Sequence, residues 1–104
     1  MIEVDDSRNS SEFDVAIGEP IEVRLSENPT TGYRWHLSAL DNPALTCEGD
    51  VFEPSQQLPG AAGVRRWWFR GLQEGVARVE LARRRSWERQ AVETFTITIR
   101  VKAP

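Results

Sequence analysis

The sequence is poor in cysteine, because Cys47 is the only one among 104 residues. A single cysteine cannot form a disulfide within the chain, so the fold does not depend on an oxidising compartment. No apolar run approaches the roughly 18 residues of a membrane-spanning helix, so we expect no membrane partner. The beginning of the chain lacks the basic and apolar segments of a signal peptide. We therefore expect a cytoplasmic protein, unless a leader has been removed and the protein is periplasmic or secreted.

Residues suited to catalysis or metal binding are also scarce. Cys47 and His36 are the only candidates for a nucleophile and an imidazole base. We expect His36 at the surface, because it alternates outward on a predicted strand, and Cys47 as a small buried apolar side chain. One cysteine and one histidine cannot form a typical structural zinc site. The acidic residues show neither calcium-loop nor paired-carboxylate spacing, so the sequence predicts no enzyme, no metal site and no cofactor.

An excess of positive charge is missing as well. The formal charge of −3 argues against a general binder of polyanions. Arginines gather at 65–66 and 83–85, but neighbouring side chains on a strand point to opposite faces and do not form one patch. We expect solvated strand ends at these positions and no nucleic-acid partner.

Apolar and polar residues alternate with a period of two through most of the chain, whereas the apolar spacing of an amphipathic helix is absent. The length predicts one domain, residues 1–104. Short strands with one apolar face and turns between them predict an all-β fold, an immunoglobulin-like antiparallel β-sandwich of about seven or eight strands. The alternating segments are 13–17, 21–25, 33–37, 65–71, 77–84 and 92–101, with shorter candidates at 44–48 and 51–53.

Most of the aromatic residues on these segments are expected in the core. They are Tyr33, Trp35, Trp67 and Phe69. Trp68 alternates to the opposite face from its neighbours. It either covers a sheet edge or joins a binding surface at one end, and the sequence leaves both alternatives open.

The loop "NPTTGY" (28–33) is longer and stiffer than a hairpin connection requires. Pro29 fixes its own φ and restricts Asn28 to extended conformations. Thr30 and Thr31 are β-branched and lose little side-chain freedom on docking, and Gly32 can take a positive φ. We expect Asn28 to brace the loop through Asx-type hydrogen bonds. A loop ordered in advance loses less entropy on binding, which favours affinity.

Two further loops stand out, "LPGAAG" (58–63) and "RRRSWERQ" (83–90). Because consecutive strands of a sandwich run up and down, we expect all three loops at one end, where they form a binding surface. Glycine and alanine permit close backbone approach, although a flexible connector explains residues 60–63 equally well. Trp87 and Arg85 are residue types that dominate interface energetics.

These loops carry a family resemblance. "NPTTGYRW", then "GAAG" before an aromatic strand, then "RSW" resemble the three signature motifs of the chagasin family, from about Phe13 to Val101. The first motif matches residue for residue. The second usually reads Gly-x-Gly-Gly and departs at Ala62, and the third usually reads Arg-Pro-Trp and departs at Ser86.

The resemblance implies an immunoglobulin-like sandwich that reversibly inhibits papain-like cysteine peptidases, without a covalent bond. It implies that the first loop enters the active-site cleft, with Thr31 nearest the peptidase cysteine, and that the other two loops grip its flanks. A bent loop need not present a carbonyl in attack geometry, which explains why it is not cleaved. The implied peptidase-binding residues are Asn28, Pro29, Thr30, Thr31, Gly32, Tyr33, Gly60, Ala61, Ala62, Gly63, Arg85, Ser86 and Trp87.

The two departures carry expectations of their own. Ala62 restricts the φ and ψ angles available to the second loop if the family's glycine at this position uses a positive φ. Ser86 in place of proline loosens the third loop and weakens binding. We expect a monomer. The alternative interpretation is a sandwich of the same shape that binds a different protein and inhibits nothing.

Overall fold

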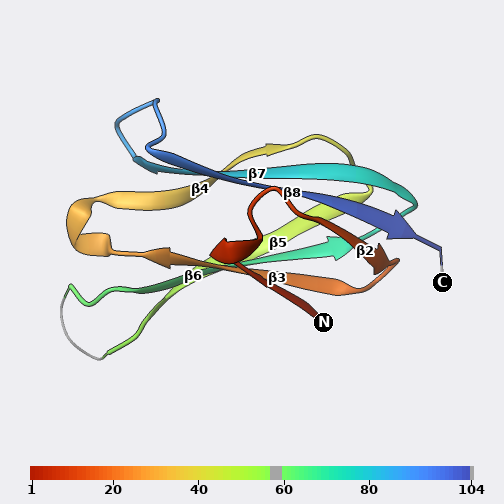
Figure 1. Cartoon of the computed structure of the whole chain (residues 1–104), viewed down its shortest axis with the longest axis horizontal. Helices are drawn as coiled ribbons and strands as arrows, with labels where there is room; N and C mark the ends of the chain where they lie inside the picture. Colours follow the sequence, from red (N-terminus) through yellow and green to blue (C-terminus); the bar gives the residue numbers. More distant parts are fainter. Residues whose placement is uncertain (57–59, 104) are drawn as a thin grey trace.

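Eight strands form two four-stranded sheets that pack face to face in the computed structural model, which describes residues 1–56 and 60–103 (Figure 1). One sheet has the strand order β1-β3-β6-β5 and the other β2-β8-β7-β4. This confirms the predicted all-β sandwich. The strands are β1 (Ile2–Asp5), β2 (Glu12–Ala16), β3 (Pro20–Glu27), β4 (Tyr33–Leu40), β5 (Leu45–Pro54), β6 (Gly63–Gly71), β7 (Gly75–Arg85) and β8 (Glu93–Lys102).

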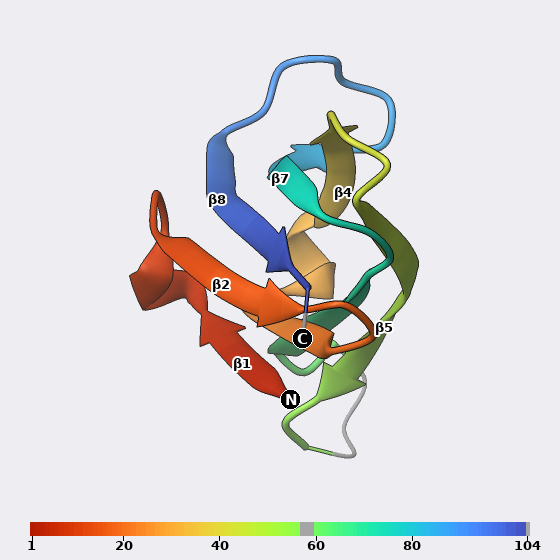
Figure 2. The same cartoon turned by 90° about the vertical axis from the view of Figure 1, so that its right-hand side faces the viewer.

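Two short 3-10 helices, η1 (Asp6–Arg8) and η2 (Pro29–Thr31), complete the elements. Across residues 1–56 and 60–103, no helix has the length and apolar character needed to span a membrane. β8 begins at the loop that follows β7 and ends at the opposite end of the molecule, which Figure 2 views end-on.

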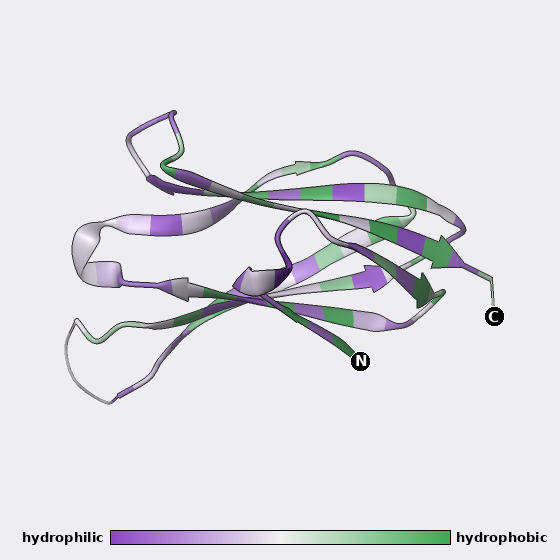
Figure 3. Cartoon of the chain, in the orientation of Figure 1, coloured by the Kyte–Doolittle hydropathy of each residue, from purple (hydrophilic) through white to green (hydrophobic). Residues whose placement is uncertain are grey.

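The core lies between the two sheets and follows the period-two pattern. Hydrophobic and hydrophilic bands alternate along β7 and β8 in Figure 3. The expected core residues Trp35, Trp67 and Phe69 are buried, whereas Tyr33 is half-buried at the rim. The other large, fully buried apolar side chains are Val4, Ile21, Val23, Leu25, Leu45, Val79, Leu81, Phe95, Ile97 and Ile99.

The edge strands β1 and β2 depart from the expected antiparallel pairing. β1 pairs in parallel with β3, with Ile2 opposite Ile21, and β2 pairs in parallel with β8, with Phe13 opposite Ile99. The chain begins on one sheet and crosses through η1 to the other, so each edge strand runs alongside a strand of the same direction. β1 has only four residues, too few to show a period in the sequence.

The two short candidates at 44–48 and 51–53 are one strand, β5. Its pairing with β6 shifts register between Cys47 and Gly49, and Gly49 has a φ of 128°. A bulge of this kind reverses the alternation, which made one strand look like two. The expected strand 13–17 is shifted by one residue, because β2 runs from Glu12 to Ala16 and Ile17 lies 41% exposed in the following turn.

The structure also places His36, Cys47 and Trp68, for which the sequence predicted surroundings. His36 is half-buried on β4, not a surface side chain, and its Nε2 is buried without a hydrogen-bond partner in the described part of the chain. Cys47 is half-buried against the core, and burial raises the pKa of its thiol. Trp68 lies in the middle of the interior strand β6, opposite Glu22 and Gly49, so it does not join the loops.

Candidate functional site

Three connections meet at one end of the sandwich, as expected. They link β3 to β4, β5 to β6 and β7 to β8 (Figure 1). We call them the first loop (28–32), the second loop (55–62) and the third loop (86–92). Of the second loop, residues 57–59 lie outside the described part of the chain, and these include Leu58 and Pro59 of the expected motif.

The first loop is closed by its own hydrogen bonds. The Asn28 Oδ1 accepts from the backbone N–H of Thr30 at 3.1 Å and from the Thr30 hydroxyl at 2.6 Å. The Asn28 carbonyl accepts from the Thr31 N–H at 3.3 Å and from the Thr31 hydroxyl at 2.8 Å. The predicted Asx-type brace is therefore present, with Asn28 extended and residues 29–31 in a 3-10 turn.

Gly32 ends this turn with a φ of 77° and donates its N–H to the Pro29 carbonyl at 3.2 Å. An L-residue rarely adopts this left-handed conformation, which explains the glycine. A Cβ at Gly32 would also lie 3.4 Å from Trp87 Cη2, because the third loop packs against this position. The first and third loops are therefore in contact.

Gly60 joins the second loop to the first. Its φ is 73°, and a Cβ there would lie 2.6 Å from the Thr30 Cγ2. Beyond it, the Ala62 carbonyl accepts from the Ser55 N–H at 3.0 Å and from the Ser55 hydroxyl at 2.6 Å. Ala62 keeps an ordinary negative φ, so its departure from glycine creates no backbone strain here. The three loops form one continuous surface.

Arg85 links the first and third loops. Its Nε donates to the Thr31 carbonyl at 3.3 Å, and its guanidinium lies 4.5 Å from the centre of the Tyr33 ring and 5.9 Å from that of Trp87. A guanidinium over aromatic faces is an attractive arrangement. Trp87 itself is 75% exposed, so its apolar surface is available to a partner.

The third loop has an internal brace that the sequence analysis missed. Arg84 lies beside it, and its Nη1 donates to the carbonyl oxygens of Arg85, Ser86 and Glu88 at 3.3, 3.4 and 3.1 Å. The Glu88 N–H also donates to the Arg85 carbonyl at 3.1 Å, closing a four-residue turn. The loop that we expected Ser86 to loosen is thus held by a neighbouring guanidinium.

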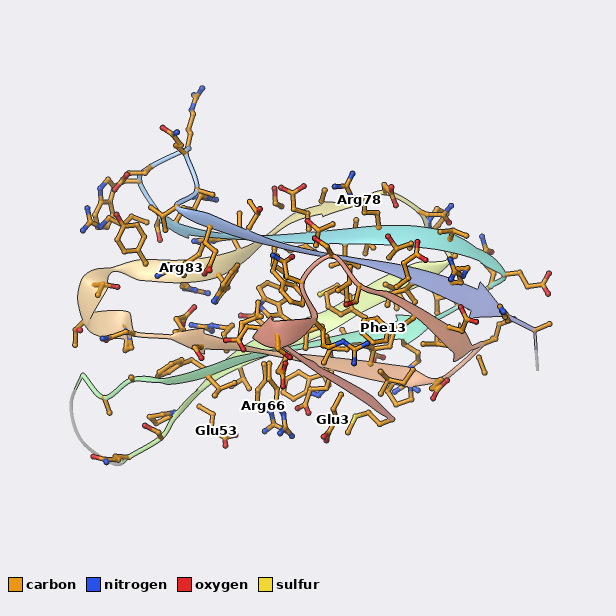
Figure 4. The ribbon with its side chains drawn as sticks, viewed as in Figure 1. Glu3, Phe13, Glu53, Arg66, Arg78 and Arg83 are labelled. Carbon is orange, nitrogen blue, oxygen red and sulfur yellow. The ribbon has the colours of Figure 1, made fainter. Side chains whose placement is uncertain are left out.

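A groove of about 560 Å³ opens between the sheets beside these loops. The first and second loops contribute Asn28 and Ala62 to its wall, and Trp35 and Glu27 form its inner part. Arg83 also lines it, near the loop end of β7 (Figure 4), and pairs with Glu93 at 3.1 Å. Among residues 1–56 and 60–103, no group of acidic, histidine or cysteine side chains is arranged to hold a metal ion.

Comparisons with known proteins agree with this geometry. The model of the family described as chagasin family peptidase inhibitor I42 matches residues 14–99. The chain is 28% identical over 102 residues to chagasin of Trypanosoma cruzi, covering 93% of each protein. It is 30% identical over 98 residues to amoebiasin-1 of Entamoeba histolytica, covering 93% of this chain and 96% of the relative.

A solved structure shares the fold. The crystal structure of the cysteine protease inhibitor EhICP2 from Entamoeba histolytica superimposes with a TM-score of 0.83 at 18% identity. The match covers 97% of this chain and 95% of the other. At this identity the likeness speaks for the fold alone.

Proposed function

Because this chain belongs to the chagasin family of peptidase inhibitors, we propose that its three-loop end occludes the active-site cleft of papain-like cysteine peptidases. Proteins of this family are inhibitors and not enzymes. The observation that carries the proposal is the contact of all three loops around a first loop that is ordered by its own hydrogen bonds. A first loop that is ordered before binding limits the entropy lost on association.

The first loop supplies the wedge of this surface. Its residues Asn28, Pro29, Thr30 and Thr31 are exposed, and we place Thr31 nearest the peptidase cysteine. Gly32 and Tyr33 turn the chain back toward the scaffold and support Arg85.

The other two loops hold the flanks of the cleft. Gly60, Ala61, Ala62 and Gly63 offer backbone that a partner can approach closely. At the third loop, Arg85 at the end of β7 provides a charged donor, and Trp87, which follows Ser86, provides an aromatic anchor. An interface of standard size buries about 800 Å² on each partner.

The hydrogen bonding of the first loop opposes its hydrolysis by a peptidase. Carbonyl oxygens at Asn28, Pro29 and Thr31 already accept hydrogen bonds within this protein. Cleavage requires the oxygen of the attacked carbonyl to enter a preorganised site of N–H donors on the enzyme. A carbonyl held by its own chain is drawn away from that site, which opposes hydrolysis after Asn28, Pro29 and Thr31. The Thr30 carbonyl accepts no hydrogen bond within the described residues, so Thr30–Thr31 is the bond at which cleavage is tested.

Residual activity of papain against increasing concentrations of this protein tests the proposal. We expect reversible inhibition in the nanomolar range, and no inhibition at micromolar concentration would contradict it. Papain whose cysteine carries a small alkyl group should still bind, because no covalent bond is involved. Rapid cleavage at Thr30–Thr31 by excess papain would show that the loop is a substrate instead.

A further inference from the structure

Two glutamates of β3 are buried, Glu22 with 0% and Glu27 with 4% of their surface exposed. A buried carboxylate is costly unless it is paired and hydrogen-bonded. Glu22 accepts hydrogen bonds from Arg66 Nε at 2.6 Å and Arg24 Nε at 2.9 Å. Arg66 projects from the outer side of its sheet (Figure 4) and also pairs with Glu53 through Nη1 at 2.8 Å. Glu27 instead follows Val23 and Leu25 in the buried alternation and stands where β3 meets the first loop.

Glu27 closes the base of the first loop. Its Oε1 accepts from the backbone N–H of Trp35 at 2.7 Å, so it joins the strand that enters the loop to the strand that leaves it. The Trp35 indole Nε1 donates to the Ser26 carbonyl at 3.0 Å, a second bond across the same base. The loop therefore starts and ends at two hydrogen-bonded points.

The second oxygen of Glu27 ties this base to the second loop. Oε2 accepts from Arg65 Nη2 at 2.7 Å and from Arg65 Nε at 3.1 Å. Arg65 also contacts Asp50 through Nη1 at 3.1 Å. Arg65 is on β6 and Asp50 on β5, the two strands that carry the second loop. One carboxylate thus connects the supports of both loops.

Packing does not replace this connection. The groove of about 560 Å³ opens directly beside Glu27, Asn28 and Trp35. A close-packed interior fixes its neighbours by contact on all sides, whereas an open groove leaves one side free. The backbone ladder of β3 and β6 already joins these two loops on one sheet and places Glu27 opposite Gly63. Glu27 adds a tie to Trp35 on β4 of the other sheet. The angle of the first loop against the second loop therefore depends on this ladder and on the polar contacts of Glu27.

We infer that Glu27 is a positioning residue for peptidase inhibition, acting through the two loops without touching the peptidase. The inference rests on the proposed function. It distinguishes Glu27 from Glu22, which is equally buried and paired to arginine but lies away from the loops.

The matched substitutions Glu27→Gln and Glu22→Gln test it. Both remove one buried charge from β3 and both should lower the thermal midpoint. For Glu27→Gln we expect papain to dissociate about tenfold faster, whereas Glu22→Gln should stay within about twofold of the unmodified protein. A purely structural role would leave the dissociation rate unchanged at Glu27, or raise it equally in both variants, and either result would overturn the inference.

Amide hydrogen exchange in the free protein gives a readout that does not need the peptidase. Exchange at Thr31 and Gly32 should be faster in Glu27→Gln and unchanged in Glu22→Gln. If the unmodified protein does not inhibit papain, the proposed function fails and this measurement alone decides the role of Glu27. Should Glu27→Gln not fold, Arg65→Lys keeps the positive charge but loses the paired hydrogen bonds from Nε and Nη2 to Glu27 Oε2. We expect the same faster amide exchange at Thr31 and Gly32 in this variant. Equal exchange in all variants would overturn the inference.

Discussion

Trp87 is the most exposed of the large apolar side chains in the described part of the chain, at 75%. Exposing an indole to water costs free energy that a partner can recover by covering it. The side chain leans on Gly32 and on the guanidinium of Arg85, so its orientation is set before binding. Little of the scaffold depends on it, because it stands outside the core.

Trp87→Ala should therefore separate binding from stability. We expect papain to dissociate at least about tenfold faster, with little change in association rate. The midpoint of thermal unfolding should hardly move, since surface substitutions change stability by about 0.5 kcal/mol or less. Stopped-flow or surface binding kinetics check the first part, and unchanged dissociation would mean that the third loop is idle.

Two glycines allow a comparison at the contact between loops. Gly60 and Gly18 both have a positive φ, 73° and 86°, so alanine at either position strains the backbone by about 1 to 2 kcal/mol. Only at Gly60 would the added Cβ meet a neighbour, the Thr30 Cγ2. Gly60→Ala should weaken papain inhibition and Gly18→Ala should not, although both lose stability. Equal inhibition by the two variants would show that the contact with Thr30 is unimportant.

At the scale of the element, the third loop is a turn closed from Arg85 to Glu88. Ser86 occupies the second position of that turn, where proline is favoured because its φ is already set. The Ser86 N–H has no hydrogen-bond partner within the described residues, so proline would remove none. In this protein the turn is ordered by Arg84 instead, which donates hydrogen bonds to three of its carbonyl oxygens.

Ser86→Pro should accordingly stabilise the protein by about 0.4 to 1 kcal/mol, mainly by restricting the unfolded chain. Inhibition of papain should tighten modestly, because less loop freedom is lost on binding. Urea unfolding and inhibition constants measured on the same preparations provide the check. A loss of stability would show that the turn does not have the geometry that proline requires.

At the scale of the whole molecule, His36 couples stability to pH. Burial and the nearby guanidinium groups of Arg84 and Arg34 lower its pKa from the usual value of about 6.5, while a hydrogen bond with the Arg84 backbone and the charge of Glu27 act in the opposite sense. The unfolded chain therefore binds a proton more readily than the folded one below pH 6.5. This histidine reduces stability as pH falls from about 6.5 through its lowered folded pKa.

The free energy of unfolding should thus decrease on acidification below about pH 6.5, and His36→Gln should remove part of that dependence. Denaturant unfolding at a series of pH values measures both curves. Asp14 adds a separate loss only near pH 4 and below, since hydrogen bonds from Lys102 and Arg100 lower the pKa of its carboxyl group. Parallel curves for the two proteins would contradict the assignment to His36.

Strands whose apolar and polar residues alternate without interruption could be predicted from the sequence. Strands that depend on pairing with a neighbouring strand, or that contain a bulge, could not. Phe95 to Val101 alternate without interruption, so β8 was evident from the residues. β5 was divided because Gly49 reverses its alternation, and β1 was missed because its stability comes from pairing with β3. Local residues cannot report either effect.

The same division applies to the candidate site. The brace at Asn28 and the positive φ of Gly32 follow from neighbouring residues, and both were predicted. Glu27 and Arg65 were missed, although both stand at inward positions of apolar alternations. Two opposite charges in such positions were the available signal, but recognising the pair required knowing that β3 lies beside β6.

The direction of β8 has a practical consequence. This strand begins beside the third loop and finishes at the far end of the molecule (Figure 1). A tether attached after Lys102 would hold the domain at the end opposite the three loops and leave the first loop facing solution. Beads or a sensor chip prepared in this way should capture peptidases from a mixture without the attachment chemistry obstructing them.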